Sequence, residues 1–133
     1  MTKLNQAILA VQGEIKALSK DKENPFFKSS YFDINQIIAE LMPLLVKNGI
    51  TVTQPLTNLV GSPALATIIS KDEERLEYVI PLPSTIKPQE MGSAITYYRR
   101  YALQSYFLLQ AEDDDANSTK GEFIQKKDNR DEF

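Results

Sequence analysis

Residues 64–82, ALATIISKDEERLEYVIPL, hold two strand-like runs joined by a charged turn. The first run is apolar and rich in β-branched residues, and the second alternates apolar and polar residues as a half-buried strand does. The turn between them, Lys71 to Arg75, is too short for a parallel crossover, so the runs are expected to pair antiparallel. A third run, Ile50 to Leu56, which Pro55 ends, completes a predicted three-stranded antiparallel meander.

Apolar residues recur at helical spacing before the strand region. A first amphipathic helix is expected at residues 2–19, with Thr2 as its N-cap. A polar connector, residues 20–33, separates it from a second helix. Pro43 is expected to kink this second helix or to start a new turn there, and Gly49 is expected to end it.

A third helix is expected from about Glu90 to Gln110. The spacing places the following residues on one of its faces: Ala94, Tyr98, Tyr101, Ser105 and Leu108. The elements together predict an α+β fold, in which a small antiparallel three-stranded sheet packs against a long C-terminal helix and the N-terminal helices. The length suits one domain, expected at residues 1–115, followed by a flexible polar tail at residues 116–133.

The composition excludes several classes of site. The 133 residues include no cysteine and no histidine, which removes disulfides, thiolate and imidazole metal sites and Ser-His-Asp catalysis. No glycine-rich loop is followed by Lys-Ser or Lys-Thr, which argues against an ATP-driven motor. The first 20 residues lack an apolar run long enough for a signal peptide or a membrane span, so we expect a cytoplasmic protein. No cofactor is expected.

Residues 92–103, GSAITYYRRYAL, place two arginines among three tyrosines on the predicted third helix. Arginine pairs with phosphate through its fork of donors, and tyrosine offers a flat face to an unstacked base. Because the net charge is −3, nucleic acid could bind only through such a local cluster. The alternative is an ordinary amphipathic helix, whose arginine stems and tyrosine rings cover apolar surface.

Neighbouring residues of this helix are expected to face different ways. Arg99 and Arg100 point about 100° apart, so they cannot both lie on the buried face. Tyr97 is expected to be exposed, whereas Tyr98 and Tyr101 are expected in the core or in an interface.

Two further features each allow two interpretations. Gly92 and Ser93, near the predicted helix start, could present free backbone N–H groups to a phosphate, or form a close packing contact and an ordinary cap. The acidic run at residues 112–115 is typical of a solvated end. It also allows an alternative function, a magnesium-dependent nuclease using residues 113–115, although a consecutive run cannot surround two ions by itself. A third hypothesis is an adaptor that docks a host protein through residues 116–133.

Four separated blocks of sequence, in the same order, resemble a known family. They are residues 24–34, NPFFKSSYFDI; residues 44–50, LLVKNGI; residues 92–103; and residues 112–115, EDDD. This combination is similar to the ERF (essential recombination function) family of phage single-strand annealing proteins. The resemblance spans residues 3–117.

The resemblance implies ATP-independent binding of single-stranded DNA and annealing of complementary strands during phage recombination, without enzymatic activity, in the bacterial host cytoplasm. It also implies that copies assemble into a ring or filament, with a phage exonuclease or a host single-strand-binding protein as further partners and no membrane. A ring of so acidic a chain would have to gather its few basic residues in one groove. The positions that match the family blocks are expected to bind nucleic acid: Lys28, Tyr31, Ser93, Thr96, Tyr97, Arg99 and Arg100.

Overall fold

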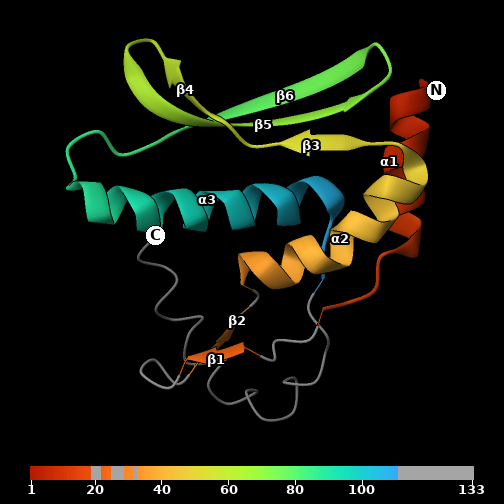
Figure 1. The fold of residues 1–133 in the computed structure, drawn as a ribbon, viewed down its shortest axis with the longest axis horizontal. Coiled ribbons are helices and arrows are strands. Elements are labelled where there is room, and N and C mark those ends of the chain that lie inside the picture. Colours follow the sequence, from red (N-terminus) through yellow and green to blue (C-terminus); the bar gives the residue numbers. More distant parts are fainter. Residues whose placement is uncertain (19–21, 25–28, 32, 111–133) are drawn as a thin grey trace, which may run out of the picture.

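Three helices pack on one face of an antiparallel sheet in the computed structural model of the chain (Figure 1). The structure describes residues 1–18, 22–24, 29–31 and 33–110. The predicted α+β class is confirmed. The other face of the sheet carries no helix or strand from the described part of the chain (Figure 1).

The sheet has four strands, not the predicted three, because the run expected from Ile50 to Leu56 ends as a strand at Thr53 and a further strand starts at Leu56. Thr53 lies opposite Ile68 and Leu56 lies opposite Leu65, so both halves keep one register against the central strand. Pro55 interrupts the run because it has no N–H to donate. Its carbonyl still accepts from the Ala66 N–H at 2.9 Å. The strands are β3 (Thr51–Thr53), β4 (Leu56–Leu59), β5 (Ser62–Lys71) and β6 (Glu74–Pro81), with β5 paired to the other three.

Helix α1 (Lys3–Glu14) is shorter than predicted. The Thr2 side chain caps its start, as expected. Its end comes at Ile15, which adopts an extended conformation, and Leu18 is then buried with its N–H donating to the Gln110 carbonyl. The helical spacing of apolar residues continues to Leu18, but this tertiary contact takes the chain out of the helix.

Helix α2 (Ile34–Asn48) runs without interruption through Pro43. Pro43 lies inside the helix and is exposed, so the carbonyl that it leaves unpaired can bond to water. The Asp33 side chain caps the start of α2, and Gly49 ends it in a left-handed conformation, with φ 67°.

The predicted polar connector contains a short antiparallel strand pair. Strand β1 (Lys22–Asn24) pairs with β2 (Ser29–Tyr31), with Lys22 opposite Tyr31. The polar composition of the connector did not predict this strand pair. The predicted tail and the acidic run lie outside the described residues.

Helix α3 (Pro88–Phe107) starts and ends a few residues before the predicted bounds and presents a different face to the core. Leu103 and Phe107 are buried, whereas Tyr101 and Leu108 are exposed. The face expected from the spacing is therefore not the one that packs against the core, since Tyr98 is half-buried and Tyr101 is exposed. Purely apolar side chains one turn apart occupy the core instead.

A single apolar core joins the helices to the sheet. Strand β5 supplies Ile69, which is fully buried between the helices and the sheet, and its pairing partner Val52 packs against the same cluster. The remaining buried members come from all three helices and the connecting segments: Leu4, Ala7, Ile8, Val11, Leu18, Ile37, Leu41, Leu45, Ile50, Leu103 and Phe107.

The two hairpins of the sheet turn through left-handed residues. In the β5–β6 turn this residue is Asp72, with φ 54°. Aspartate adopts the left-handed conformation more readily than most residues. In the β4–β5 turn it is Val60, with φ 50°, followed by Gly61 with φ 83°. A left-handed conformation costs a residue with a Cβ roughly 1–2 kcal/mol, and a β-branched side chain is an outlier there.

Removing the ring of Phe107 should strongly destabilise the fold. We expect Phe107→Ala to lower the free energy of unfolding by about 3–5 kcal/mol, because it leaves a cavity where α3 meets the core. Leu9→Ala, at an exposed position of α1, should change it by less than about 0.5 kcal/mol. Urea unfolding followed by circular dichroism measures both, and equal effects would contradict the assigned core.

Candidate nucleic-acid interface

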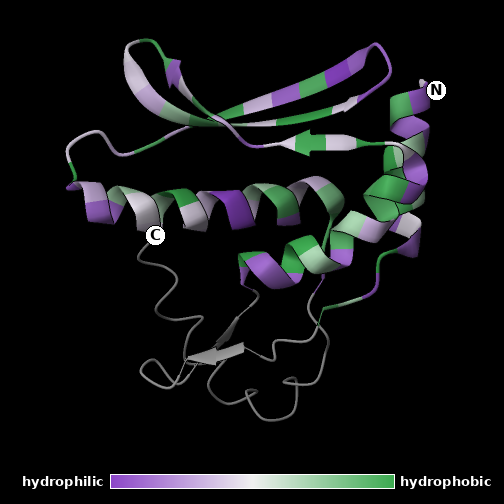
Figure 2. Ribbon diagram, viewed as in Figure 1, coloured by the Kyte–Doolittle hydropathy of each residue, from purple (hydrophilic) through white to green (hydrophobic). Residues whose placement is uncertain are grey.

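The middle of α3 carries a hydrophilic band between more apolar segments (Figure 2). This band contains the adjacent residues Arg99 and Arg100. As predicted, the two lie on different sides of the helix. Arg99 lines an apolar pocket beside α2, and Arg100 borders an open depression on the exposed face.

Arg100 lies over two tyrosine rings on the exposed face of α3. Its guanidinium carbon is 5.7 Å from the centre of the Tyr97 ring and 5.4 Å from the centre of the Tyr101 ring. The two ring centres are 4.6 Å apart, and the rings are 48% and 46% exposed. These cation–π contacts hold the guanidinium beside the open depression that Arg100 helps to line. We call these three residues the Arg–Tyr cluster.

Tyr101 raises the pKa of Tyr97, chiefly because two neighbouring phenolates would repel each other. Arg100 acts in the opposite direction, since its positive charge favours the phenolate. The net pKa is higher than that of an isolated tyrosine, so Tyr97 remains a neutral ring at neutral pH. A neutral ring can stack on a base without repelling the adjacent phosphates.

An open depression adjoins the Arg–Tyr cluster along about three turns of α3. It is lined by Gln89, Gly92, Ser93, Thr96, Tyr97 and Arg100. The Thr96 hydroxyl donates to the Gly92 carbonyl at 3.3 Å, so its proton is engaged within the helix. The Ser93 hydroxyl has no hydrogen-bond partner among the described residues, so it can donate to an anion.

Neither interpretation of Gly92 and Ser93 made from the sequence holds. Because α3 begins at Pro88, both residues lie inside the helix, where backbone N–H groups are bonded to carbonyls one turn earlier. Gly92 forms no close packing contact either, because a Cβ built there would have no atom within 4 Å. The free N–H groups were predicted from a helix start placed too late along the chain.

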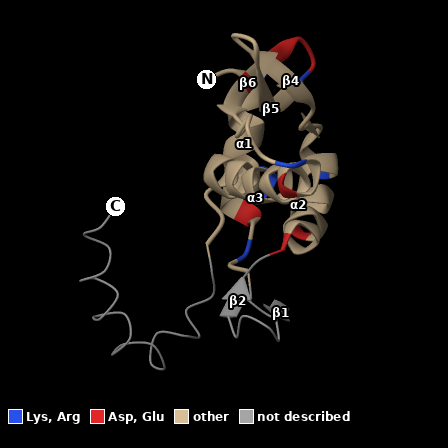
Figure 3. Cartoon of the chain, turned by 90° about the vertical axis from the view of Figure 1, so that its left-hand side faces the viewer, with Lys and Arg blue, Asp and Glu red and all other residues tan. Residues whose placement is uncertain are grey.

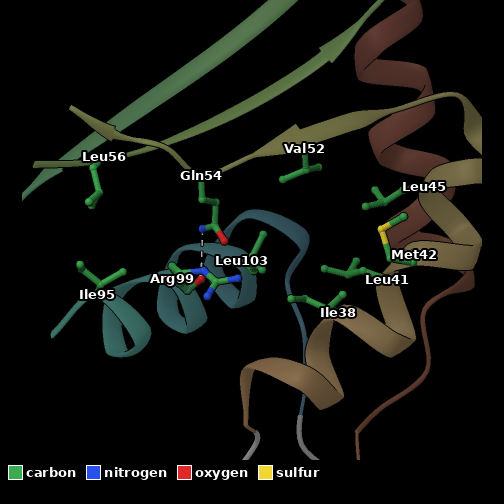
Figure 4. A pocket seen from close by; sticks show the side chains of 10 residues that line it. All are labelled: Ile38, Leu41, Met42, Leu45, Val52, Gln54, Leu56, Ile95, Arg99 and Leu103. Carbon is green, nitrogen blue, oxygen red and sulfur yellow. Dashed lines mark hydrogen bonds between the residues drawn. The ribbon is translucent and has the colours of Figure 1, made fainter. Parts of the chain in front are cut away.

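Arg99 belongs to a different environment from Arg100. Its pocket lies between α2, α3 and the edge strand, and Figure 4 shows the surrounding side chains directed into it. The Arg99 carbonyl accepts from the Gln54 side chain at 3.3 Å. Its guanidinium has no ion pair with another described residue.

The structure therefore brings together only part of the predicted site. Ser93, Thr96, Tyr97 and Arg100 line one depression, and Arg99 does not. Lys28 lies outside the described residues, and Tyr31 is described only by its place in β2. Tyr101 was missed as a site residue, although its position four residues after Tyr97 is the helical spacing that brings the two rings together.

The charged residues are distributed unevenly over the described part of the chain. Figure 3 shows basic residues on α3 and acidic residues at the hairpin turn that contains Asp72 and Glu73. No group of three acidic residues within the described ranges could hold a metal ion. No helix of these ranges is long and apolar enough to cross a membrane.

Comparison with known families identifies the chain. The model of the ERF superfamily matches residues 4–132, nearly the whole length. The chain belongs to the ERF superfamily. The match extends past residue 117, where the resemblance in the sequence was expected to end. Searches of curated proteins and of solved structures found no match.

Membership in the ERF superfamily implies a general role in phage recombination and single-strand annealing, and with it DNA binding. Proteins of this family are generally not catalytic. The residues that the family model matches include the Arg–Tyr cluster and the residues that line its depression.

The pKa of Tyr97 should respond to its two neighbours in opposite directions. We expect Tyr101→Phe to lower it towards the ordinary value, because the repelling phenolate is removed. Arg100→Ala should raise it further, because the cation that favours the phenolate is lost. NMR titration of ring-labelled tyrosines measures both shifts. Shifts of the same sign in the two variants would show that the rings and the guanidinium are not arranged as described.

Proposed function

We propose that this ERF-superfamily chain binds single-stranded DNA along the exposed face of α3 and anneals complementary strands without ATP, as a homo-oligomer. The observation that supports this best is the Arg–Tyr cluster, in which one guanidinium lies over two exposed rings. Arginine supplies a phosphate contact and the rings supply stacking surfaces, the two requirements for holding a single strand without reading its sequence. In the proposed complex, Ser93 donates a further hydrogen bond to the backbone.

The proposed annealing mechanism is physical rather than chemical. The basic side chains replace counterions on one strand and hold it extended, so that its bases remain accessible to a second strand. Pairing and stacking of the duplex then supply the driving force, about 1.4 kcal/mol per base-pair step. No residue of the cluster has to change its covalent state.

Assembly is part of the proposal because one copy offers few cations. The net charge of the chain is −3, so a single molecule would attract DNA only weakly. Copies lined up along a strand repeat the same weak contact, and each further contact becomes intramolecular once the first has formed. An exonuclease or a single-strand-binding protein could deliver the strands to such an assembly.

Arg100 and Arg99 should differ in their effect on DNA binding. We expect Arg100→Ala to weaken binding of a short oligonucleotide by about tenfold, since a charged hydrogen bond to phosphate is lost. The slope of log affinity against log salt should fall in magnitude by about 0.7, the value for one phosphate of a single strand. Fluorescence anisotropy at several salt concentrations measures both quantities.

Arg99→Ala is the matched control for this experiment, because it removes the adjacent arginine from the other side of the helix. It should leave the salt slope nearly unchanged. If Arg100→Ala leaves affinity and slope intact in a folded protein, the exposed face of α3 does not bind the strand.

Gly92 offers a second test that separates stability from binding. Gly92→Ala should raise the free energy of unfolding by roughly 0.5–1 kcal/mol, because alanine favours the helix and its Cβ meets no atom within 4 Å. A strand lying in the depression would contact that Cβ, so affinity for the oligonucleotide should fall. Gly13→Ala in α1 also meets no atom within 4 Å and should raise stability without any change in affinity. Equal affinities for both variants would argue against a strand in this depression.

A further inference from the structure

Val60 is exposed and strained at the same time. It is the first residue of the two-residue turn between β4 and β5, where Leu59 pairs with Ser62. Positive φ at both Val60 and Gly61 is the pattern of a type I′ turn, whose first position favours asparagine, aspartate or glycine. Valine is unfavourable there, and its side chain is 96% exposed.

Neither the geometry of the turn nor packing against the core of the same molecule explains why a valine occupies this position. The turn is otherwise well ordered, because the Asn58 side chain accepts from the Gly61 N–H at 2.8 Å. The valine therefore projects an apolar group into water from a short, hydrogen-bonded hairpin. Leu59 beside it is also partly exposed. We call Leu59 and Val60 the hairpin knob.

The pocket beside Arg99 has the complementary chemistry. Its volume is about 390 Å³, and eight of its ten lining residues are apolar: Ile38, Leu41, Met42, Leu45, Val52, Leu56, Ile95 and Leu103. Figure 4 shows these side chains converging from α2, α3 and the β3–β4 edge. Leu56 is 62% exposed and Met42 is half-exposed, so apolar surface continues to the rim.

The hairpin knob cannot reach the pocket of its own molecule. Val60 lies four residues along the chain from Leu56, which lines the pocket, and an extended strand spans roughly 13 Å over that distance. Figure 1 shows the β4–β5 turn directed away from α2. A knob that fits such a pocket must therefore come from a second copy.

We propose that the hairpin knob of one copy inserts into the apolar pocket of the next. The knob and the pocket are different surfaces, so the contact is head-to-tail, and in a joined pair one copy still offers its knob and the other its pocket. Contacts of this kind build rings when they close and filaments when they do not. The inference rests on the assembly part of the proposed function and names the surfaces that make it. No residue of the pocket lines the depression beside the Arg–Tyr cluster, so assembly leaves that face open.

Val60→Asn tests the knob without damaging the fold. Asparagine suits the first position of a type I′ turn, so the variant should unfold at the same temperature as the wild type or higher. It should nevertheless weaken self-association by at least about tenfold, because the buried valine is lost. Light scattering and sedimentation of the full chain over a concentration series measure the mass.

Met42→Lys tests the pocket in the same way, since it places a charge at a half-exposed rim position where lysine keeps the helix propensity. Leu9→Lys on α1 is the matched control, an exposed apolar residue that does not line the pocket. The control should assemble like the wild type.

Mixing the two variants tests whether the two surfaces meet each other. Val60→Asn keeps its pocket and Met42→Lys keeps its knob, so an equal mixture of two monomeric variants should form a one-to-one dimer. Failure to form this dimer would overturn the proposal, as would normal assembly of either variant alone. A loss of DNA affinity in Met42→Lys at unchanged mass would assign the pocket to a strand instead. If the wild type itself remains monomeric, the assembly part of the proposed function fails as well.

Discussion

The burial of Leu103 and Phe107 fixes the rotation of α3 about its own axis, and the functional surfaces follow from that rotation. A helix of 20 residues with one buried stripe must expose the rest of its circumference. With this stripe against the sheet and the other helices, Arg99 faces the apolar pocket and Arg100 faces solvent with the tyrosines. A different rotation would exchange the environments of the two arginines.

An acidic chain can bind nucleic acid only where its few cations are well placed. Arg100 is positioned by two rings on its own helix, so little of its conformational freedom remains to be lost when a phosphate binds. One such contact is weak, and its repetition along a strand depends on how copies are arranged. The hairpin knob and the apolar pocket would provide that arrangement at surfaces separate from the Arg–Tyr cluster.

The local features of the fold were predictable because they depend on residues close together in the sequence. Thr2 and Gly49 act at the helix ends where their chemistry suggested, and the β5–β6 hairpin forms across the short turn that predicted antiparallel pairing. The features that were missed depend on distant residues. Leu18 leaves the helical pattern, and its N–H donates to the Gln110 carbonyl.

The candidate site likewise combines features that nearby residues determine with features that depend on distant residues. The sequence alone determined that two arginines and three tyrosines occupy one helix, that the arginines diverge and that the blocks resemble one family, because these follow from spacing and residue type. Only the tertiary structure decided which arginine faces solvent, that Tyr101 lies beside Tyr97 in the open, and that an apolar pocket opens beside α2. Helical periodicity defines several possible faces, and only packing against the sheet selects the buried one.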